Sequence, residues 1–103
     1  MADVRFTRRC FNEDLQRLPK WAQKEAIAAA ESIATNPEMG LPLEPPLDRF
    51  RRIRLRNVYR LVYGYDSESD TWWIYLIGKR QPGKERDVYQ MLKDITGRSG
   101  SAV

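Results

Sequence analysis

The fold of this chain is decided by residues 50–80, which read FRRIRLRNVYRLVYGYDSESDTWWIYLIGKR. Three stretches of this segment, 50–56, 59–65 and 71–79, carry the alternating or continuous apolar residues that are typical of β-strands. The polar, acidic residues 66–70 separate the second stretch from the third and predict an exposed turn. The segment therefore predicts three consecutive antiparallel strands, the last of them buried on both faces.

The first of these strands is rich in arginine: residues 49–60 contain six arginines and no acidic residue. Because successive side chains of a strand alternate between its faces, Arg52, Arg54 and Arg56 are predicted to share one face of the sheet. A solvated basic edge strand, which discourages aggregation, explains such charges without any function. Guanidinium groups also bind phosphate bidentately, and this density of arginine without acidic neighbours favours a phosphate-binding surface.

The face on which Arg60 lies depends on the length of the first hairpin turn. A two-residue turn at Asn57 and Val58 points Arg60 away from Arg52 and Arg54. A turn of three residues, or a bulge, places Arg60 beside them. The sequence is compatible with both arrangements.

The elements outside the three strands complete an α+β fold. They are predicted to be a strand at 4–6, helices at 8–18 and 21–35, and a last helix at 85–95. The order β-α-α-β-β-β-α predicts a small, mostly antiparallel twisted sheet with an N-terminal helix hairpin packed on one face. We expect one domain, residues 1–96, and a disordered tail, residues 97–103.

Helical periodicity predicts the buried face of each helix in the hairpin. The first helix repeats apolar residues at steps of four and three, namely Phe11, Leu15 and Leu18. The second helix presents a stripe of mostly small residues, namely Ala22, Ala26, Ala29 or Ala30, and Ile33. Residues 39–48 hold three prolines, so they predict an ordered, extended connection whose leucines enter the core.

The composition narrows the possible chemistry. Lys and Arg number 18, Asp and Glu number 14, and the net charge of +4 weakly favours an anionic partner. Histidine is absent, which excludes a Ser-His-Asp triad, a histidine acid–base pair and an ordinary zinc site. No carboxylates are spaced to bind a metal, so we expect neither metal nor cofactor.

The cellular location is predicted from two absences. The single cysteine, Cys10, cannot form an internal disulfide, and a free thiol suits a reducing cytoplasm. No apolar run reaches membrane-spanning length, and the first residues lack the apolar core of a signal peptide. We therefore expect a cytoplasmic protein with no membrane partner.

Four motifs occur in a recognisable order: Leu55-Arg56, Tyr59-Arg60-Leu61-Val62-Tyr63, Gly78-Lys79-Arg80 and Asp87-Val88-Tyr89. In this order, and over residues 4–95, the chain resembles the RelE/ParE toxin superfamily. No single motif is specific, so the combination carries the resemblance. The chain is most similar to the RelE branch, whose members are ribosome-dependent messenger RNA endonucleases of type II toxin–antitoxin systems.

The resemblance implies roles for individual residues. Arg60 matches an arginine that contacts the scissile phosphate, Arg80 one that stabilises charge in the transition state, and Tyr89 a tyrosine that stacks on a base and takes part in the chemistry. Arg52 and Arg54 occupy the positions of two basic residues, usually lysines, that grip the RNA backbone. Arg54 is included among the catalytic positions, although an always-protonated arginine is a poor general base. Further phosphate contacts are expected from Arg56, Lys79 and Arg86.

The implied reaction is metal-independent attack of the RNA 2′-hydroxyl on the adjacent phosphate, with arginines neutralising the developing charge. The implied partners are messenger RNA in the ribosomal A site, the ribosome, a cognate antitoxin that neutralises the toxin, and operator DNA through the antitoxin complex alone. Two alternatives stay open. One is a ParE-like poison of DNA gyrase, and the other is a non-catalytic nucleic-acid-binding module whose affinity falls steeply with salt.

Overall fold

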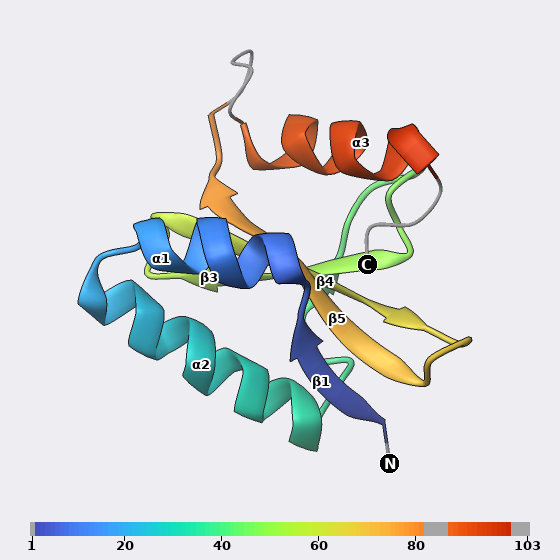
Figure 1. Cartoon of the computed structure of the whole chain (residues 1–103), viewed down its shortest axis with the longest axis horizontal. Helices are drawn as coiled ribbons and strands as arrows, with labels where there is room; N and C mark the ends of the chain where they lie inside the picture. The colour runs from blue at the N-terminus through green and yellow to red at the C-terminus, as the bar shows by residue number, and fades with distance from the viewer. Residues whose placement is uncertain (1, 82–86, 100–103) are drawn as a thin grey trace.

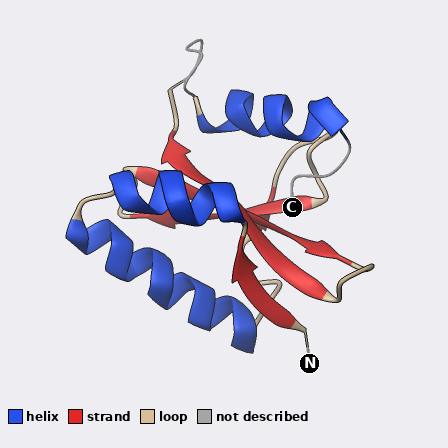
Figure 2. Ribbon diagram, in the orientation of Figure 1, coloured by secondary structure: helices blue, strands red, loops and turns tan. Residues whose placement is uncertain are grey.

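A five-stranded sheet, with strand order β1-β5-β4-β3-β2, forms the centre of the molecule (Figure 2). This computed structural model describes residues 2–81 and 87–99. The strands are β1 (Asp3–Phe6), β2 (Leu41–Pro42), β3 (Phe50–Leu55), β4 (Tyr59–Asp66) and β5 (Thr71–Lys79). β1 pairs with β5 in parallel and the other neighbours pair antiparallel. The predicted α+β fold is confirmed, with a mixed sheet and with β2 as a short additional strand.

Helices cover both faces of the sheet. The helix hairpin consists of residues 8–17, which end in α1 (Leu15–Arg17), and of α2 (Lys20–Thr35), while α3 (Val88–Ser99) follows β5 (Figure 1). Leu61 packs with the hairpin and its neighbour Val62 packs with α3. Because adjacent strand residues point to opposite faces, the hairpin and α3 lie on opposite sides of the sheet. None of the helices in the described part of the chain has the length and apolar character needed to span a membrane.

The core on the hairpin side contains the predicted alanine stripe of α2. Ala22, Ala26, Ala29 and Ile33 are buried there. Small side chains let this helix approach β1 and β3 closely, and large residues of β4 and β5 fill the space between the two layers. The core on the α3 side contains the following residues: Leu43, Phe50, Val62, Tyr75, Leu76, Val88 and Leu92.

The first helix differs from its predicted register. Leu15 and Leu18 are buried, but Phe11 is 50% exposed. The reason is a π-helical segment, η1 (Cys10–Asp14), in which a wider turn shifts the inward face by one residue. Cys10 and Asp14 therefore face the core, and the prediction that Phe11 lies in the buried stripe is wrong. Burial also raises the pKa of the Cys10 thiol well above its ordinary value, and the neighbouring Asp14 carboxylate raises it further.

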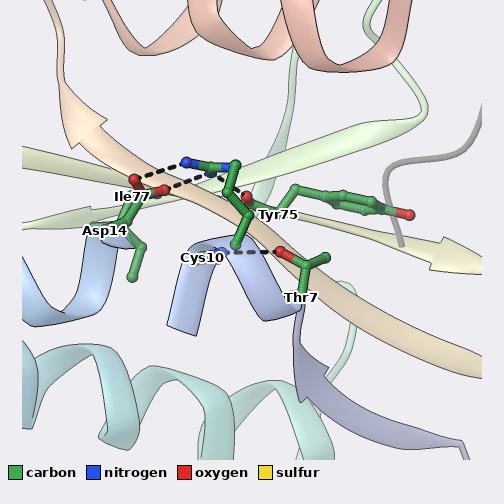
Figure 3. A network of polar contacts seen from close by, with 6 residues as sticks. Thr7, Cys10, Asp14, Tyr75 and Ile77 are labelled. Carbon is green, nitrogen blue, oxygen red and sulfur yellow. Dashed lines mark hydrogen bonds and ion pairs between the residues drawn. The ribbon is translucent and has the colours of Figure 1, made fainter. Parts of the chain in front are cut away.

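Asp14 joins this helix to the edge of β5 (Figure 3). β1 ends at Phe6, so β5 has no neighbouring strand on that side beyond Ile74. Asp14 accepts a 3.1 Å hydrogen bond from the backbone N–H of Ile77, and Arg9 donates one of 2.8 Å to the carbonyl of Tyr75. Arg9 and Asp14 also form a two-pronged ion pair with N–O distances of 3.0 and 2.6 Å. The pair takes the place of a missing strand.

The connection between α2 and β3 is anchored on Tyr63. The Tyr63 hydroxyl donates to the carbonyl of Pro37 at 2.7 Å and accepts from the N–H of Gly40 at 2.9 Å. Leu43 and Leu47 join the core on the α3 side as predicted, whereas Leu41 is 60% exposed. The connection thus begins anchored to Tyr63, in the core on the hairpin side, and its later residues Leu43 and Leu47 lie against the face that α3 covers.

Gly40→Ala is expected to lower the free energy of unfolding by about 1–3 kcal/mol, which is the usual range for overpacking. A Cβ atom at this position would lie 2.8 Å from the carbonyl oxygen of Arg52 and 2.8 Å from the Tyr63 ring. Urea denaturation followed by tryptophan fluorescence measures the change. Gly78→Ala is the matched control because its Cβ would lie 3.5 Å from Val88, an ordinary contact. Equal effects of the two substitutions would contradict the prediction.

Candidate nucleic-acid interface

A pocket of about 570 Å³ opens on the face of the sheet that α3 covers. Residues 42–47 contribute prolines, leucines and Glu44 to its lining, and α3 contributes Tyr89 and Lys93. The strands and the chain after β5 contribute four arginines, namely Arg52, Arg54, Arg60 and Arg80. The pocket therefore combines apolar walls with a dense group of cations.

The turn between β3 and β4 brings three of these arginines together. Residues 56–58 separate the two strands, and Arg54 pairs directly with Arg60. Directly paired residues of antiparallel strands point to the same face, and Arg52 shares it by alternation. The turn has three residues because Arg56 and Asn57 both adopt positive φ, 49° and 63°, and Val58 donates a hydrogen bond back to Leu55. Arg60 therefore lies on the same face of the sheet as Arg52 and Arg54, which the sequence alone did not decide.

The positive charges of the arginines in β3 and β4 are hardly neutralised by contacts within the protein. Arg54 donates to the side-chain oxygen of Asn57 at 3.3 Å, and Arg60 donates to the carbonyl of Tyr59 at 3.4 Å. Within the part of the chain that the structure describes, neither of them nor Arg52 forms an ion pair. Of the described residues that line the pocket, Glu44 alone is acidic. Cations held together in this way repel each other, and an anion bound among them relieves the repulsion.

Among the residues that the structure describes, Arg80 is paired with a carboxylate, unlike the other three arginines. This is Asp87, which was included in a sequence motif without a predicted role. Arg80 forms a 2.6 Å ion pair with Asp87, and its guanidinium lies 4.8 Å from the centre of the Tyr89 ring. Burial by itself raises the pKa of Asp87, but the Arg80 guanidinium and the N–H of Gln81 outweigh it and hold that pKa below its usual range. An aspartate just before a helix is a typical N-cap, which is the signal that could have singled it out.

Two of the predicted phosphate-binding residues lie outside the pocket. β3 ends at Leu55, and Arg56 turns toward α2, where it forms a 2.5 Å ion pair with Glu25 and stacks 4.6 Å from the ring centre of Trp21. The prediction that Arg56 shares a face with Arg52 and Arg54 is wrong because strand alternation stops at the turn.

Lys79 also lies outside the pocket. It pairs across the sheet with Tyr59 and lies 5.9 Å from the centre of that ring, on the face that the helix hairpin covers. Arg86 lies outside the described residues. The structure thus brings together Arg52, Arg54, Arg60, Arg80 and Tyr89 of the predicted site.

The arrangement suits an anion better than a metal ion. Among residues 2–81 and 87–99, no group of three or more histidines, cysteines, aspartates or glutamates could hold a metal. Arginine forks bind the oxygens of a phosphate, and an aromatic ring beside them offers a surface on which a nucleobase stacks. The pocket has the chemical features of a site for single-stranded nucleic acid.

The chain matches the sequence profile of the ParE toxin of the type II toxin–antitoxin system parDE over residues 4–82. The matched segment includes the four arginines of the pocket and ends before Asp87 and Tyr89. A comparison with curated proteins gives no match.

Solved structures include similar chains. The toxin–antitoxin complex RelBE2 from Mycobacterium tuberculosis contains a chain with 30% identity and a TM-score of 0.63, and the match covers 77% of this chain and 91% of that one. The isolated RelE toxin of Escherichia coli is 18% identical with a TM-score of 0.65, covering 92% of this chain and 99% of that one. The intact Escherichia coli RelBE toxin–antitoxin complex is 18% identical with a TM-score of 0.65, covering 79% and 99%.

Proposed function

The chain belongs to the RelE/ParE superfamily of toxins of type II toxin–antitoxin systems, and we propose that it acts as an endoribonuclease on messenger RNA. The observation that carries the proposal is the pocket in which Arg52, Arg54, Arg60 and Arg80 meet beside Tyr89. Three of these arginines have no ion-pair partner among the described residues, so they are available to phosphate oxygens.

The reaction needs no nucleophile from the protein. The 2′-hydroxyl of the RNA loses its proton and attacks the adjacent phosphorus, the bond from phosphorus to the 5′-oxygen breaks, and that oxygen leaves with a proton. The products are a 2′,3′-cyclic phosphate and a 5′-hydroxyl end. Arg60 and Arg80 stabilise the negative charge that grows on the phosphate, and Arg52 and Arg54 hold the neighbouring backbone. A base stacked on Tyr89 brings its own phosphate within reach of Arg80.

The weak point of such a site is proton transfer. Arg54 stands where a lysine is usual in this superfamily, and arginine does not act as a base near neutral pH. A site of this kind gains most when the RNA is already held in the reactive geometry, because orientation replaces part of the missing acid–base catalysis. The ribosomal A site can hold the messenger RNA in this geometry, so the ribosome is the proposed partner in catalysis.

A cognate antitoxin is the proposed protein partner, because chains similar to this one occur in toxin–antitoxin complexes. Its neutralising segment crosses the helix hairpin and the sheet and disturbs or blocks the arginine pocket. Operator DNA is reached through the antitoxin alone. A complex whose pocket is open and which still cleaves RNA would contradict direct blocking.

End-mapping of messenger RNA tests the proposed function. Purified protein is incubated with an RNA, with and without ribosomes paused at a defined codon, and Arg80→Ala is treated in parallel. Cuts within the paused codon that disappear in the variant support a ribosome-dependent nuclease. Cuts on free RNA keep the nuclease and remove the ribosome from the proposal. No cuts under either condition would overturn it.

Poisoning of DNA gyrase is the second candidate, because the matched family profile is that of a ParE toxin. This function predicts inhibited supercoiling of plasmid DNA by gyrase and intact RNA in the end-mapping experiment. A supercoiling assay with purified gyrase distinguishes the two functions. Arg60→Ala in the same assay shows whether the pocket takes part.

Arg56→Gln is expected to change RNA cleavage by less than about twofold, because Arg56 pairs with Glu25 on the opposite side of the sheet from the pocket. Its side chain is 63% exposed, so the loss of stability should stay near the ~0.2–1 kcal/mol of exposed ion pairs. Single-turnover cleavage and urea denaturation measure the two quantities. Arg54→Gln is the matched control, with the same change two residues away inside the pocket. A loss of activity in Arg56→Gln equal to that of the control would show that Arg56 reaches the RNA.

A further inference from the structure

Asp87 lies where the chain after β5 meets the first turn of α3, and both of its carboxylate oxygens are engaged. Oδ1 accepts from Arg80 at 2.6 Å and from the N–H of Gln81 at 2.5 Å, and Oδ2 accepts from the N–H of Tyr89 at 3.2 Å. The residue is 4% exposed. One buried carboxylate therefore contacts two residues of the pocket, Arg80 and Tyr89.

Helix capping alone does not require a carboxylate at this position. The bond from Tyr89 N–H is the usual N-cap bond, and asparagine or serine makes it about as well as aspartate. A buried charge without a partner is costly, so aspartate here depends on its ion pair with Arg80. The ion pair with Arg80 therefore explains why this residue is an aspartate, whereas the capping of α3 does not.

The contact with Asp87 also fixes the position of the Arg80 side chain. It lies just beyond the end of β5, among the cations Arg54 and Arg60 that line the same pocket. A free arginine side chain populates many rotamers, and its like-charged neighbours drive it away from the pocket. The Asp87 carboxylate counters both effects, and it is itself held in place by the backbone N–H groups of Gln81 and Tyr89.

The geometry leaves Arg80 able to bind a second anion. A guanidinium has five N–H donors, and the contact with Asp87 uses Nη1 of Arg80. One carboxylate cannot occupy all five donors, so donors remain for a phosphate oxygen. The guanidinium lies over the Tyr89 ring at 4.8 Å, so its position relative to a base stacked at Tyr89 is set before RNA arrives.

We propose that Asp87 is a positioning residue that holds the Arg80 guanidinium over Tyr89 in the orientation required at the scissile phosphate. This inference rests on the proposed endoribonuclease function. Asp87 does not touch the RNA and acts through Arg80. It also links the placement of α3 to that of Arg80, because the same carboxylate caps the helix and pairs with the arginine.

The opposite reading is that Asp87 competes with phosphate for Arg80 and restrains the enzyme. The two hypotheses predict opposite changes in activity when Asp87 is removed. A competitor raises activity when it is removed, whereas a positioning residue lowers it. The anchoring of Asp87 by two backbone N–H groups favours positioning, because the carboxylate need not leave when RNA binds.

The test is a double-mutant cycle of Asp87→Asn and Arg80→Ala, measured as cleavage of messenger RNA on paused ribosomes. Asn keeps the helix cap and removes the charge. Asp87→Asn is expected to lower kcat about 10²-fold, the effect of a misplaced catalytic group, with KM changed less than about threefold. In the Arg80→Ala background the same substitution is expected to have no further effect. Asp94→Asn, which removes an exposed carboxylate from the same helix, is the control and should cleave like the wild type.

Two results would overturn the inference. Cleavage by Asp87→Asn at or above the wild-type rate would make Asp87 a competitor. An equal fall of kcat in the wild-type and Arg80→Ala backgrounds would show that Asp87 acts independently of Arg80, through the structure of the protein.

A side-chain NMR measurement separates failure of this inference from failure of the proposed function. The Nη–H signals of Arg80 are expected to be shifted and protected from exchange in the wild type, because Nη1 contacts Asp87, and to move to the position of a solvent-exposed arginine in Asp87→Asn. If the wild type cuts no RNA, the nuclease function fails, and the same spectra still decide whether Asp87 orients Arg80. An Arg80 signal that is identical in the two proteins overturns the positioning role.

Discussion

Arg80→Ala is expected to lower the rate of RNA cleavage by about 10²–10³, the usual effect of removing one donor that stabilises charge in a transition state. The guanidinium of Arg80 lies in the pocket, fixed by Asp87 and the Tyr89 ring. Its loss removes a charge that the RNA cannot replace. Both hydrophobic cores keep all their residues, so the fold should persist. Stability should fall, because the buried Asp87 carboxylate loses its ion pair and keeps only the N–H groups of Gln81 and Tyr89.

The measurement is single-turnover cleavage at equal RNA occupancy, so that weaker binding is not mistaken for slower chemistry. Arg60→Ala is expected to have an effect of the same order, because Arg60 lies directly opposite Arg54 on the same face. Lys79→Ala is the matched control: it removes a positive charge one residue before Arg80, on the face that the hairpin covers. Near-wild-type cleavage by Arg80→Ala, or an equal loss in Lys79→Ala, would contradict the assignment.

Asp14→Ala is expected to cause the largest loss of stability, about 3 kcal/mol, at the lower end of the range for breaking a buried ion pair. The Asp14 side chain is 4% exposed and that of Arg9 is 29% exposed, so Arg9 regains some hydration when its partner is removed. The N–H of Ile77 loses its acceptor inside the protein. A domain with a total stability of about 5–15 kcal/mol would lose a large part of it.

Urea denaturation followed by circular dichroism measures this loss, and Glu13→Ala is the control because Glu13 is the exposed neighbour of Asp14. Replacing both partners with apolar residues, Arg9→Met with Asp14→Leu, rescues many buried ion pairs. It should fail here, because the carbonyl of Tyr75 and the N–H of Ile77 would both stay unpaired. A loss below about 1 kcal/mol in Asp14→Ala, or full rescue by the double substitution, would show that the pair does not complete the edge of β5.

Periodicity along the chain was enough to predict most of the fold. Strands alternate and helices repeat every three to four residues, so the three consecutive strands and the alanine stripe of α2 follow from local pattern alone. The same holds for the concentration of arginine in residues 49–60 and for the absence of histidine. The order of the motifs also predicted the RelE/ParE superfamily, and the family match confirms this prediction.

The tertiary structure decided where individual side chains lie, because that depends on backbone geometry and on partners distant in the sequence. Two residues with positive φ lengthen the first turn and bring Arg60 beside Arg54, while the same turn sends Arg56 to Glu25, 31 positions away. A π-helical segment turns Phe11 outward. Asp87 meets Arg80, which is seven residues earlier in the chain. Local propensity sets which elements form, and only the packed chain sets which charges meet.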